Sequence, residues 1–170
     1  MCYNEPVDKG SRIQTSSSGV NDMRYSKIIF VSQDDTYRGP IAATILKRII
    51  GNKEIKIESR GMVVLFPEPA NAKGIEVAKR HGLNLARHTA RQLSNVDFGV
   101  DTLVLAMTER SKQKIYDKFV NVVNVYSIKE FIGSTGDVDI PYGRSIEEYE
   151  DNFVFMETLV KEVIKKIESL

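Results

Sequence analysis

The sequence has few of the residues on which cysteine and metal chemistry depend. Its 170 residues include one cysteine, two histidines (His81 and His88) and no tryptophan. A single cysteine excludes an internal disulfide framework and any cysteine-rich zinc or iron–sulfur site. Because that cysteine is Cys2, at the extreme N-terminus, a catalytic cysteine inside the fold is excluded too. We therefore expect no metal and no cofactor.

The sequence also lacks an excess of one charge and a long apolar run. Its 24 Lys and Arg against 23 Asp and Glu give a net charge of +1, without the basic surplus typical of nucleic-acid-binding proteins. No run approaches the roughly 20 apolar residues that a membrane span needs, and residues 1–26 contain no signal-peptide core. We expect a cytoplasmic protein that binds neither nucleic acid nor membrane. Its oligomeric state is left open.

The composition that remains is typical of one globular domain, with 42% hydrophobic and 28% charged residues. Residues 1–26 are rich in Ser, Gly and Asn, which favours a flexible N-terminal arm. Cys2 lies in this arm without a lipidation signal, so we assign it no role. Residues 27–170 are then the folded domain.

From Lys27 onward, apolar runs alternate with segments of helical periodicity. Buried strands are predicted at 27–31, 55–59, 102–106 and 122–126. Helices are predicted from Pro40 to Gly51, at 72–81, at 109–119, and in a last segment whose apolar stripe runs from Ile146 to Leu170. That stripe fits a helix packed on a sheet better than a coiled coil. The alternation predicts an α/β fold with a parallel sheet covered on both faces.

The loop at 32–39 is the first candidate site, because ligands of such sheets bind at the carboxyl ends of the strands. Its sequence, SQDDTYRG, leads into Pro40 and a helix. Such a loop directs several backbone N–H groups toward one point, beside the positive end of a helix dipole. Arg38 adds a planar donor fork suited to phosphate. The commoner alternative for such an arginine is an ion pair with a nearby carboxylate.

The stretch KIIFVSQDDTYRGPIAATILK resembles the opening of the low-molecular-weight protein tyrosine phosphatases, in which a strand leads into Cys-(x)5-Arg-Ser-Pro and a helix. Similar segments follow in order: SRGM at 59–62, the segment 67–93, DTLVLAM at 101–107 and DVDIPYG at 137–143. The resemblance covers about 27–169. It implies a three-layer α/β fold with a four-stranded parallel sheet of order 2-1-3-4 and helices on both faces.

The resemblance also implies which residues hold phosphate, and the sequence departs from the family there. The phosphate-binding loop would be Gln33, Asp34, Asp35, Thr36, Tyr37 and Arg38. Asp34 and Asp35 replace Gly and Asn of the family. Each carboxylate could lie about 5 Å from a bound phosphate, which costs roughly 3 kcal/mol at an effective dielectric near 20. Aspartate tolerates left-handed backbone geometry, so the loop shape can survive.

The family nucleophile is missing as well. Ser32 stands at the position of the catalytic cysteine, and a serine hydroxyl ionises far less readily than a thiol. No base for Ser32 is evident from the sequence. Gly39 replaces the family serine after arginine, whose hydroxyl would support a thiolate.

The family general acid is altered in the same way. Ile140 takes the place of the aspartate before proline that protonates the leaving group. Asp139 is its neighbour, but adjacent side chains in extended backbone point in opposite directions. Asp139 would therefore reach the site only if its loop were remodelled.

The remaining candidates shape or support the site. Phe66 and Tyr142 match the family's substrate rim. The alternative for Phe66 is a packed anchor of its loop, and the alternative for Tyr142 is a loop tyrosine half-packed on the surface. His88 is expected to brace the phosphate loop, through Asp35, and Arg91 to be a structural ion-pair donor.

Three hypotheses follow from these departures. The first, which we favour, is a degenerate phosphatase that retains at most an oxyanion-binding loop for a phosphotyrosine-containing protein or another phosphate. The second is an active phosphatase with Ser32 or water as nucleophile. The third is a scaffold in which Asp34 and Asp35 neutralise Arg38 and no anion binds.

Overall fold

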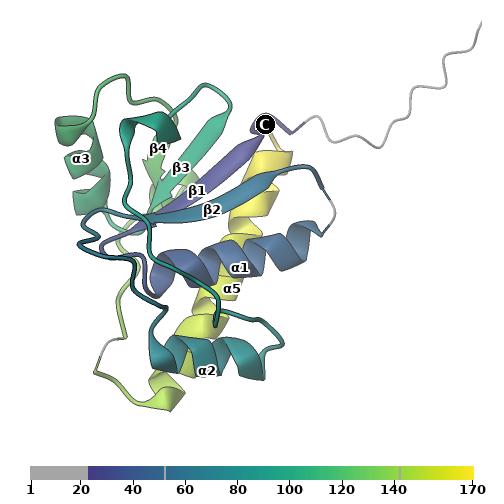
Figure 1. The fold of residues 1–170 in the computed structure, drawn as a ribbon. Helices are drawn as coiled ribbons and strands as arrows, with labels where there is room; N and C mark the ends of the chain where they lie inside the picture. The colour runs from purple at the N-terminus through teal and green to yellow at the C-terminus, as the bar shows by residue number, and fades with distance from the viewer. Residues whose placement is uncertain (1–22, 52, 142) are drawn as a thin grey trace, which may run out of the picture.

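The computed structural model describes residues 23–51, 53–141 and 143–170, and in them a four-stranded parallel sheet carries the fold (Figure 1). The strands are β1 (Lys27–Ser32), β2 (Lys56–Gly61), β3 (Thr102–Ala106) and β4 (Val125–Ser127). Their order across the sheet is β2-β1-β3-β4, and every neighbouring pair is parallel. The α/β class, the sheet order and the parallel direction predicted from the sequence are confirmed.

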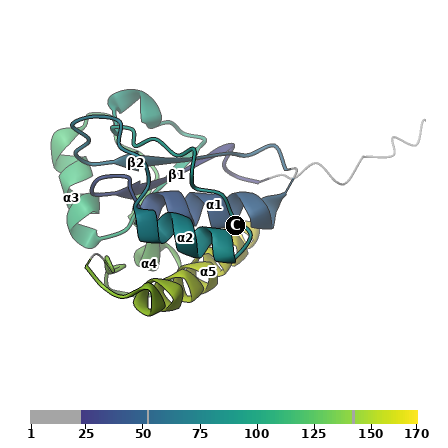
Figure 2. The same cartoon turned by 60° about the horizontal axis from the view of Figure 1, so that its bottom comes forward.

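Helices cover both faces of this sheet. They are α1 (Arg38–Ile50), α2 (Ala72–Arg80), α3 (Glu109–Lys118), α4 (Ile128–Phe131) and α5 (Ile146–Glu168), with a short 3-10 turn, η1 (Asn95–Asp97). Helices α1, α2 and α5 lie together on one side of the sheet, and α3 lies on the other (Figures 1 and 2). The result is the three-layer arrangement expected.

The strand β1 divides the core into two parts because successive side chains of a strand point to opposite faces. Ile28 and Phe30 pack in the larger cluster, with residues of α1 and α5. Ile29 and Val31 pack in the smaller cluster, with Ile115 of α3. All four β1 side chains are fully buried, so the position of the strand, and of the loop that follows it, is fixed from both sides.

The register of the sheet brings several chain segments to one edge. Ser32, the last residue of β1, pairs with Gly61, the last residue of β2, and Val31 pairs with Ala106 at the end of β3. The segments that leave these strands therefore emerge side by side. This edge carries the loop 32–38, which resembles a phosphate-binding loop, together with the segment after β2 and the start of α3.

Several element boundaries differ from the sequence-based prediction. Strand β1 extends to Ser32 and β2 is Lys56–Gly61, not 55–59. Helix α1 begins at Arg38, two residues before Pro40, which a helix tolerates because the first N–H groups have no intrahelical partner in any case. Strand β4 is Val125–Ser127, not 122–126. Asn121 and Asn124 have φ angles of 55° and 54°, so left-handed turns occupy the segment in which a longer strand was expected.

The last helix follows its predicted stripe. Tyr149, Phe153, Met156 and Val160 are buried, and α5 packs on α1 and α2. Leu170, the end of the predicted stripe, lies beyond the helix and is 55% exposed. The predicted arm falls almost wholly in residues 1–22, outside the described residues, as does Cys2. Among the helices that are described, none is long and apolar enough to cross a membrane.

Candidate functional site

The loop between β1 and α1 is held by its carbonyl groups. The carbonyls of Ser32 and Gln33 accept from the N–H groups of Met62 and Val63, both at 2.9 Å. Because N–H and C=O point in opposite directions across a trans peptide, the N–H groups of Gln33 and Asp34 face the opposite way, into the loop.

The second half of the loop is held in the same manner. The Thr36 carbonyl accepts from the Asn71 N–H at 2.8 Å, and the Asp35 carbonyl lies 2.6 Å from Nε2 of His88. The N–H groups of Thr36 and Tyr37 are thereby turned inward as well. The backbone has the shape of an anion cradle, and the start of α1 adds the positive end of a helix dipole.

Ser32 lies at the base of this cradle, with its side chain buried. The residue is 2% exposed, and its Oγ has no hydrogen-bond partner among the described residues. Gly39 is one reason why Oγ of Ser32 has no partner, because a Cβ at position 39 would lie 3.1 Å from this atom. A side chain at 39 would thus contact the hydroxyl of Ser32, and glycine supplies none.

Asp34 places a carboxylate where the inward N–H groups converge. Its Oδ1 accepts from the Thr36 N–H at 3.1 Å and from the Thr36 hydroxyl at 2.8 Å. One of the inward donors is therefore already bound to a negative charge of the chain itself.

Asp35 has a different role from Asp34. Its φ is 60°, the left-handed conformation that aspartate tolerates, and it is fully buried. Its Oδ2 accepts from the backbone N–H of Arg91 at 2.9 Å and lies 3.6 Å from Nε2 of His88. Burial raises the pKa of the Asp35 carboxyl, while hydrogen bonds from Ser59 and Arg91 and the charges of His88 and Arg60 act in the other direction. We expected this carboxylate near a bound phosphate. It contacts His88 and Arg91 instead.

Tyr37 contributes its backbone alone to the loop. Its ring is fully buried, packs edge-on against Tyr149 at 5.0 Å between centroids, and covers Gly74, where a Cβ would lie 2.6 Å from the ring. The hydroxyl donates to Oδ1 of Asn152 at 2.7 Å. This side chain anchors the loop to α2 and α5.

Arg38, the first residue of α1, is 6% exposed and reaches the loop that contains the expected general-acid position. Its Nη1 donates to the Val138 carbonyl at 2.9 Å. Val138 in turn donates its N–H to the Met107 carbonyl at 2.9 Å. The segment around residues 137–141 is therefore attached to Arg38 at the end of the loop 32–38, and through its backbone to Met107, the residue that follows β3.

The carboxylates of that segment point elsewhere. Asp137 caps α3, because its Oδ1 accepts from the Glu109 N–H at 2.8 Å. Asp139 is exposed and lines a hollow with Pro141 and residues of α5. Ile140, 38% exposed, lines both that hollow and the one that contains Arg38. The loop thus presents Ile140 toward Arg38.

The mouth of the loop is a hollow of about 360 Å³. Its described lining consists of Gln33, Arg38, Thr108, Arg110, Ser111, Lys114 and Ile140. Three of these residues are cations and none is a carboxylate. Arg110 and Lys114 are not among the site residues expected from the sequence. Their spacing of four residues at the start of a helix that follows a parallel strand was the available signal, because it places both on one face at the same sheet edge.

Only one of the two rim candidates lies within the described residues. Phe66 lies in the segment after β2 and is 61% exposed. Tyr142 lies outside the described residues. Arg91, expected to form an ion pair, has no carboxylate at ion-pair distance among the described residues, and its backbone N–H is the group that binds Asp35.

The parallel α/β sheet and the arginine-bearing loop of inward N–H groups define the class: a protein with a phosphate-loop architecture after its first strand. The sequence profile described as "Low molecular weight phosphotyrosine protein phosphatase" matches residues 27–169. The chain belongs to the low-molecular-weight protein tyrosine phosphatase family.

Individual relatives agree with this assignment. The chain is 33% identical over 128 residues to the low-molecular-weight protein-tyrosine-phosphatase PtpB of Staphylococcus haemolyticus, across 75% of this chain and 89% of the relative. The solved structure of the phosphatase from T. tengcongensis superposes with a TM-score of 0.76 at 31% identity, across 82% of this chain and 98% of that one. A mutant of the YwlE arginine phosphatase was solved with a phosphorylated active-site serine. It superposes with a TM-score of 0.76 at 30% identity, across 84% of this chain and 95% of that one.

Proposed function

We propose that this protein is a catalytically degenerate phosphatase that binds a phosphate or related oxyanion in the loop 32–38 and turns it over inefficiently or not at all. The observation that carries the proposal is Ser32: its hydroxyl is buried at the base of the loop with no hydrogen-bond partner among the described residues. A serine nucleophile needs an adjacent base. No described side chain accepts its proton.

The leaving-group side supports the same proposal. Ile140 borders the hollow that contains Arg38, whereas Asp139 borders the one on the far side of the segment. Remodelling that would bring Asp139 to the site has to break the contact between Arg38 and Val138. An aryl phosphate in the loop would therefore lose its phenolate without a proton donor.

Anion binding is the property that the site retains. Arg38, Arg110 and Lys114 surround the mouth without a lining carboxylate, and the inward N–H groups complete the cradle. Asp34 opposes binding because it occupies the Thr36 N–H. We propose that the ligand is a phosphorylated side chain of a cytoplasmic protein, phosphotyrosine in the first instance.

Removing the Asp34 carboxylate should therefore strengthen binding. We expect Asp34→Ala to lower the Kd for phosphotyrosine about tenfold, because a unit charge about 5 Å from the anion costs up to roughly 3 kcal/mol at a dielectric near 20. Titration calorimetry measures the affinity, with Asp139→Ala as the control that removes the same charge outside the mouth. No binding by either variant or by the native chain would leave the scaffold hypothesis.

A second function is favoured by one relative. The YwlE mutant was solved with a phosphorylated active-site serine, and Ser32 occupies the position of the family nucleophile. The oxygen of Ser32 would then bond to the phosphorus of a substrate as the bond to the leaving group breaks, and the serine proton would pass to the leaving group. Water would hydrolyse the resulting phosphoserine slowly.

One paired experiment separates these functions. The native chain, Ser32→Ala, and Ser32→Cys with Ile140→Asp are incubated with an aryl phosphate and with a phosphoarginine peptide. We expect no turnover by the native chain and measurable aryl phosphatase activity in the double variant, because a thiolate and a general acid are both restored. Intact-mass spectrometry detects phosphoserine.

The outcomes are distinct. Turnover by the native chain that Ser32→Ala abolishes contradicts degeneracy and establishes an active phosphatase. A phosphoryl adduct on Ser32 without turnover supports the second function. Binding without turnover or adduct supports the first.

A further inference from the structure

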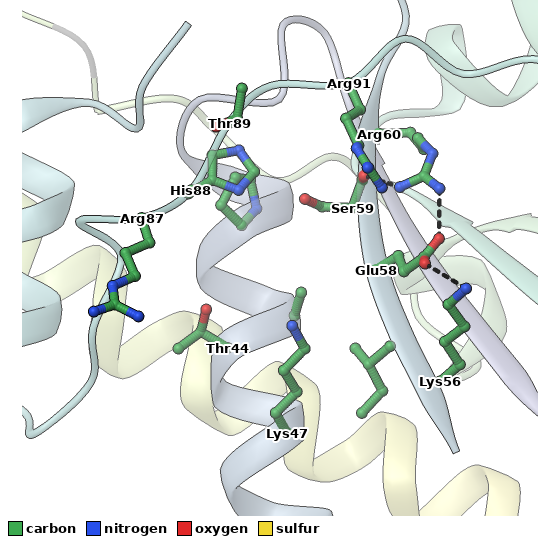
Figure 3. Close-up of a pocket in the computed structure, with 13 residues that line it drawn as sticks. Thr44, Lys47, Lys56, Glu58, Ser59, Arg60, Arg87, His88, Thr89 and Arg91 are labelled. Carbon is green, nitrogen blue, oxygen red and sulfur yellow. Dashed lines mark hydrogen bonds and ion pairs between the residues drawn. The ribbon is translucent and has the colours of Figure 1, made fainter. Parts of the chain in front are cut away.

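A second pocket, separate from the loop, lies between α1, β2 and the segment 87–91 (Figure 3). Its volume is about 450 Å³, within the range of small-molecule sites. Thr44 and Lys47 line it from α1, the stretch from Lys56 to Arg60 lines it from β2, and the segment from Arg87 to Arg91 closes it. We call it the basic pocket. It shares no lining residue with the mouth around Arg38.

The charges of the basic pocket do not balance. Five cations line it, Lys47, Lys56, Arg60, Arg87 and Arg91, against one carboxylate, Glu58. Because the chain as a whole has a net charge of +1, this is a local concentration of positive charge that composition does not reveal. Such a concentration inside a hollow attracts anions.

Glu58 accounts for part of the positive charge. It lies 3.0 Å from Nζ of Lys56 and 2.5 Å from Nη2 of Arg60, and 3.2 Å from Nζ of Lys27. Burial alone would raise the pKa of Glu58, but the hydrogen bonds from Lys56 and Lys27 and the charge of Arg60 lower it to about 2. Asp97 also pairs with Arg60, at 3.3 Å. These pairs fix the side chains of Lys56 and Arg60 along one face of β2.

The charges of the other three cations in the basic pocket are not balanced by any carboxylate that the structure describes. Within the described residues, Lys47, Arg87 and Arg91 have no carboxylate at ion-pair distance. Lys47 reaches the pocket from α1, and Arg87 and Arg91 come from the two ends of the segment 87–91 and lie on opposite sides of Lys47 (Figure 3). The hydroxyls of Ser59 and Thr89 also line the space. The Ser59 hydroxyl donates to Asp35, so the three unbalanced cations supply the charge of the site. They form a site for an oxyanion of more than one negative charge.

We propose that the basic pocket binds a diphosphate group, as a second ligand site distinct from the loop at Ser32. One phosphate would lie between Lys47 and Arg91, over the strand β2, and the other would extend across α1 toward Arg87. Free pyrophosphate and a nucleoside diphosphate share this chemistry, and the volume of the pocket admits either.

Calorimetric titration of the full chain with pyrophosphate and with ADP tests the proposal. The pocket variant is Lys47→Gln with Arg87→Gln, and the control is Lys79→Gln with Lys161→Gln, which removes two charges elsewhere. Because each charge-assisted contact contributes about tenfold, we expect the pocket variant to raise the Kd about a hundredfold and the control to change it less than twofold. Both altered pocket residues are exposed, so folding is retained, as circular dichroism will verify.

Amide chemical shifts distinguish this pocket from the first site. Pyrophosphate should shift Thr44, Ser59 and Thr89, and Arg38→Lys should leave those shifts and their Kd unchanged. Equal or tighter binding of ADP identifies the nucleotide as the source, and weaker binding identifies free diphosphate. The proposal is overturned if neither ligand binds, if the pocket variant binds as the native chain does, or if the shifts fall on Gln33, Thr108 and Ser111 alone.

Discussion

Asp35 is a fully buried carboxyl whose hydrogen bonds support the loop from behind. Its raised pKa means that the folded chain holds the Asp35 proton more tightly than the unfolded chain does. This carboxyl therefore favours the fold at low pH, and its contribution is lost as pH rises from 3.8 through the raised pKa. At neutral pH the buried charge destabilises the fold.

Asp35→Asn should accordingly stabilise the protein at neutral pH. Asparagine tolerates the same φ of 60°, and its amide oxygen can accept from Arg91. We expect a gain of about 1 kcal/mol, or roughly 3 °C in Tm for a chain of this size. Thermal unfolding of native and variant chains at pH 4 and pH 7.5 measures it. A gain that is equal at both pH values would contradict the assignment to the carboxylate charge.

The element that closes the fold is α5, which begins with a capping box. The Ser145 hydroxyl accepts from the Glu148 N–H at 3.3 Å, and Oε2 of Glu148 accepts from the Ser145 N–H at 2.9 Å. The helix then packs on α1, the helix that begins at Arg38. The cap thus stabilises α5, and the position of α1 and of the loop 32–38 before it depends on that helix.

Ser145→Ala should lower stability by about 1 kcal/mol, the usual cost of losing a serine cap, which corresponds to a fall in Tm of roughly 3 °C. Thermal unfolding followed by circular dichroism measures it. Ser134→Ala is the matched control, because Ser134 lies exposed in the loop before the helix. Equal Tm values for the two variants would show that the capping box contributes nothing.

At the scale of the whole molecule, the two candidate anion sites lie on different parts of one frame. The mouth at Arg38 opens at the carboxyl ends of the strands, and the basic pocket lies between α1 and the edge strand β2. Ser59, His88 and Arg91 line the basic pocket and also contact Asp35 of the loop. The loop is therefore held in shape by the wall of the second pocket.

The sequence by itself determined the sheet and the first loop. Short apolar runs separated by helical periodicity permit few arrangements other than a covered parallel sheet, and this rule does not depend on contacts between distant residues. The predicted departures at Ser32, Gly39 and Ile140 came from the resemblance to the family, since they depend only on which residue types stand at the positions of its motif.

The tertiary structure decided where charges point. Asp34 and Asp35 are neighbours in the sequence, but Asp34 faces into the loop and Asp35 faces the segment 88–91, because the left-handed backbone at Asp35 turns its side chain the other way. Lys47, Arg87 and Arg91 line one pocket because α1, β2 and the segment 87–91, which are far apart in the chain, pack together. No local sequence pattern predicts that these three cations line one pocket, since this follows from how the segments pack in the complete fold.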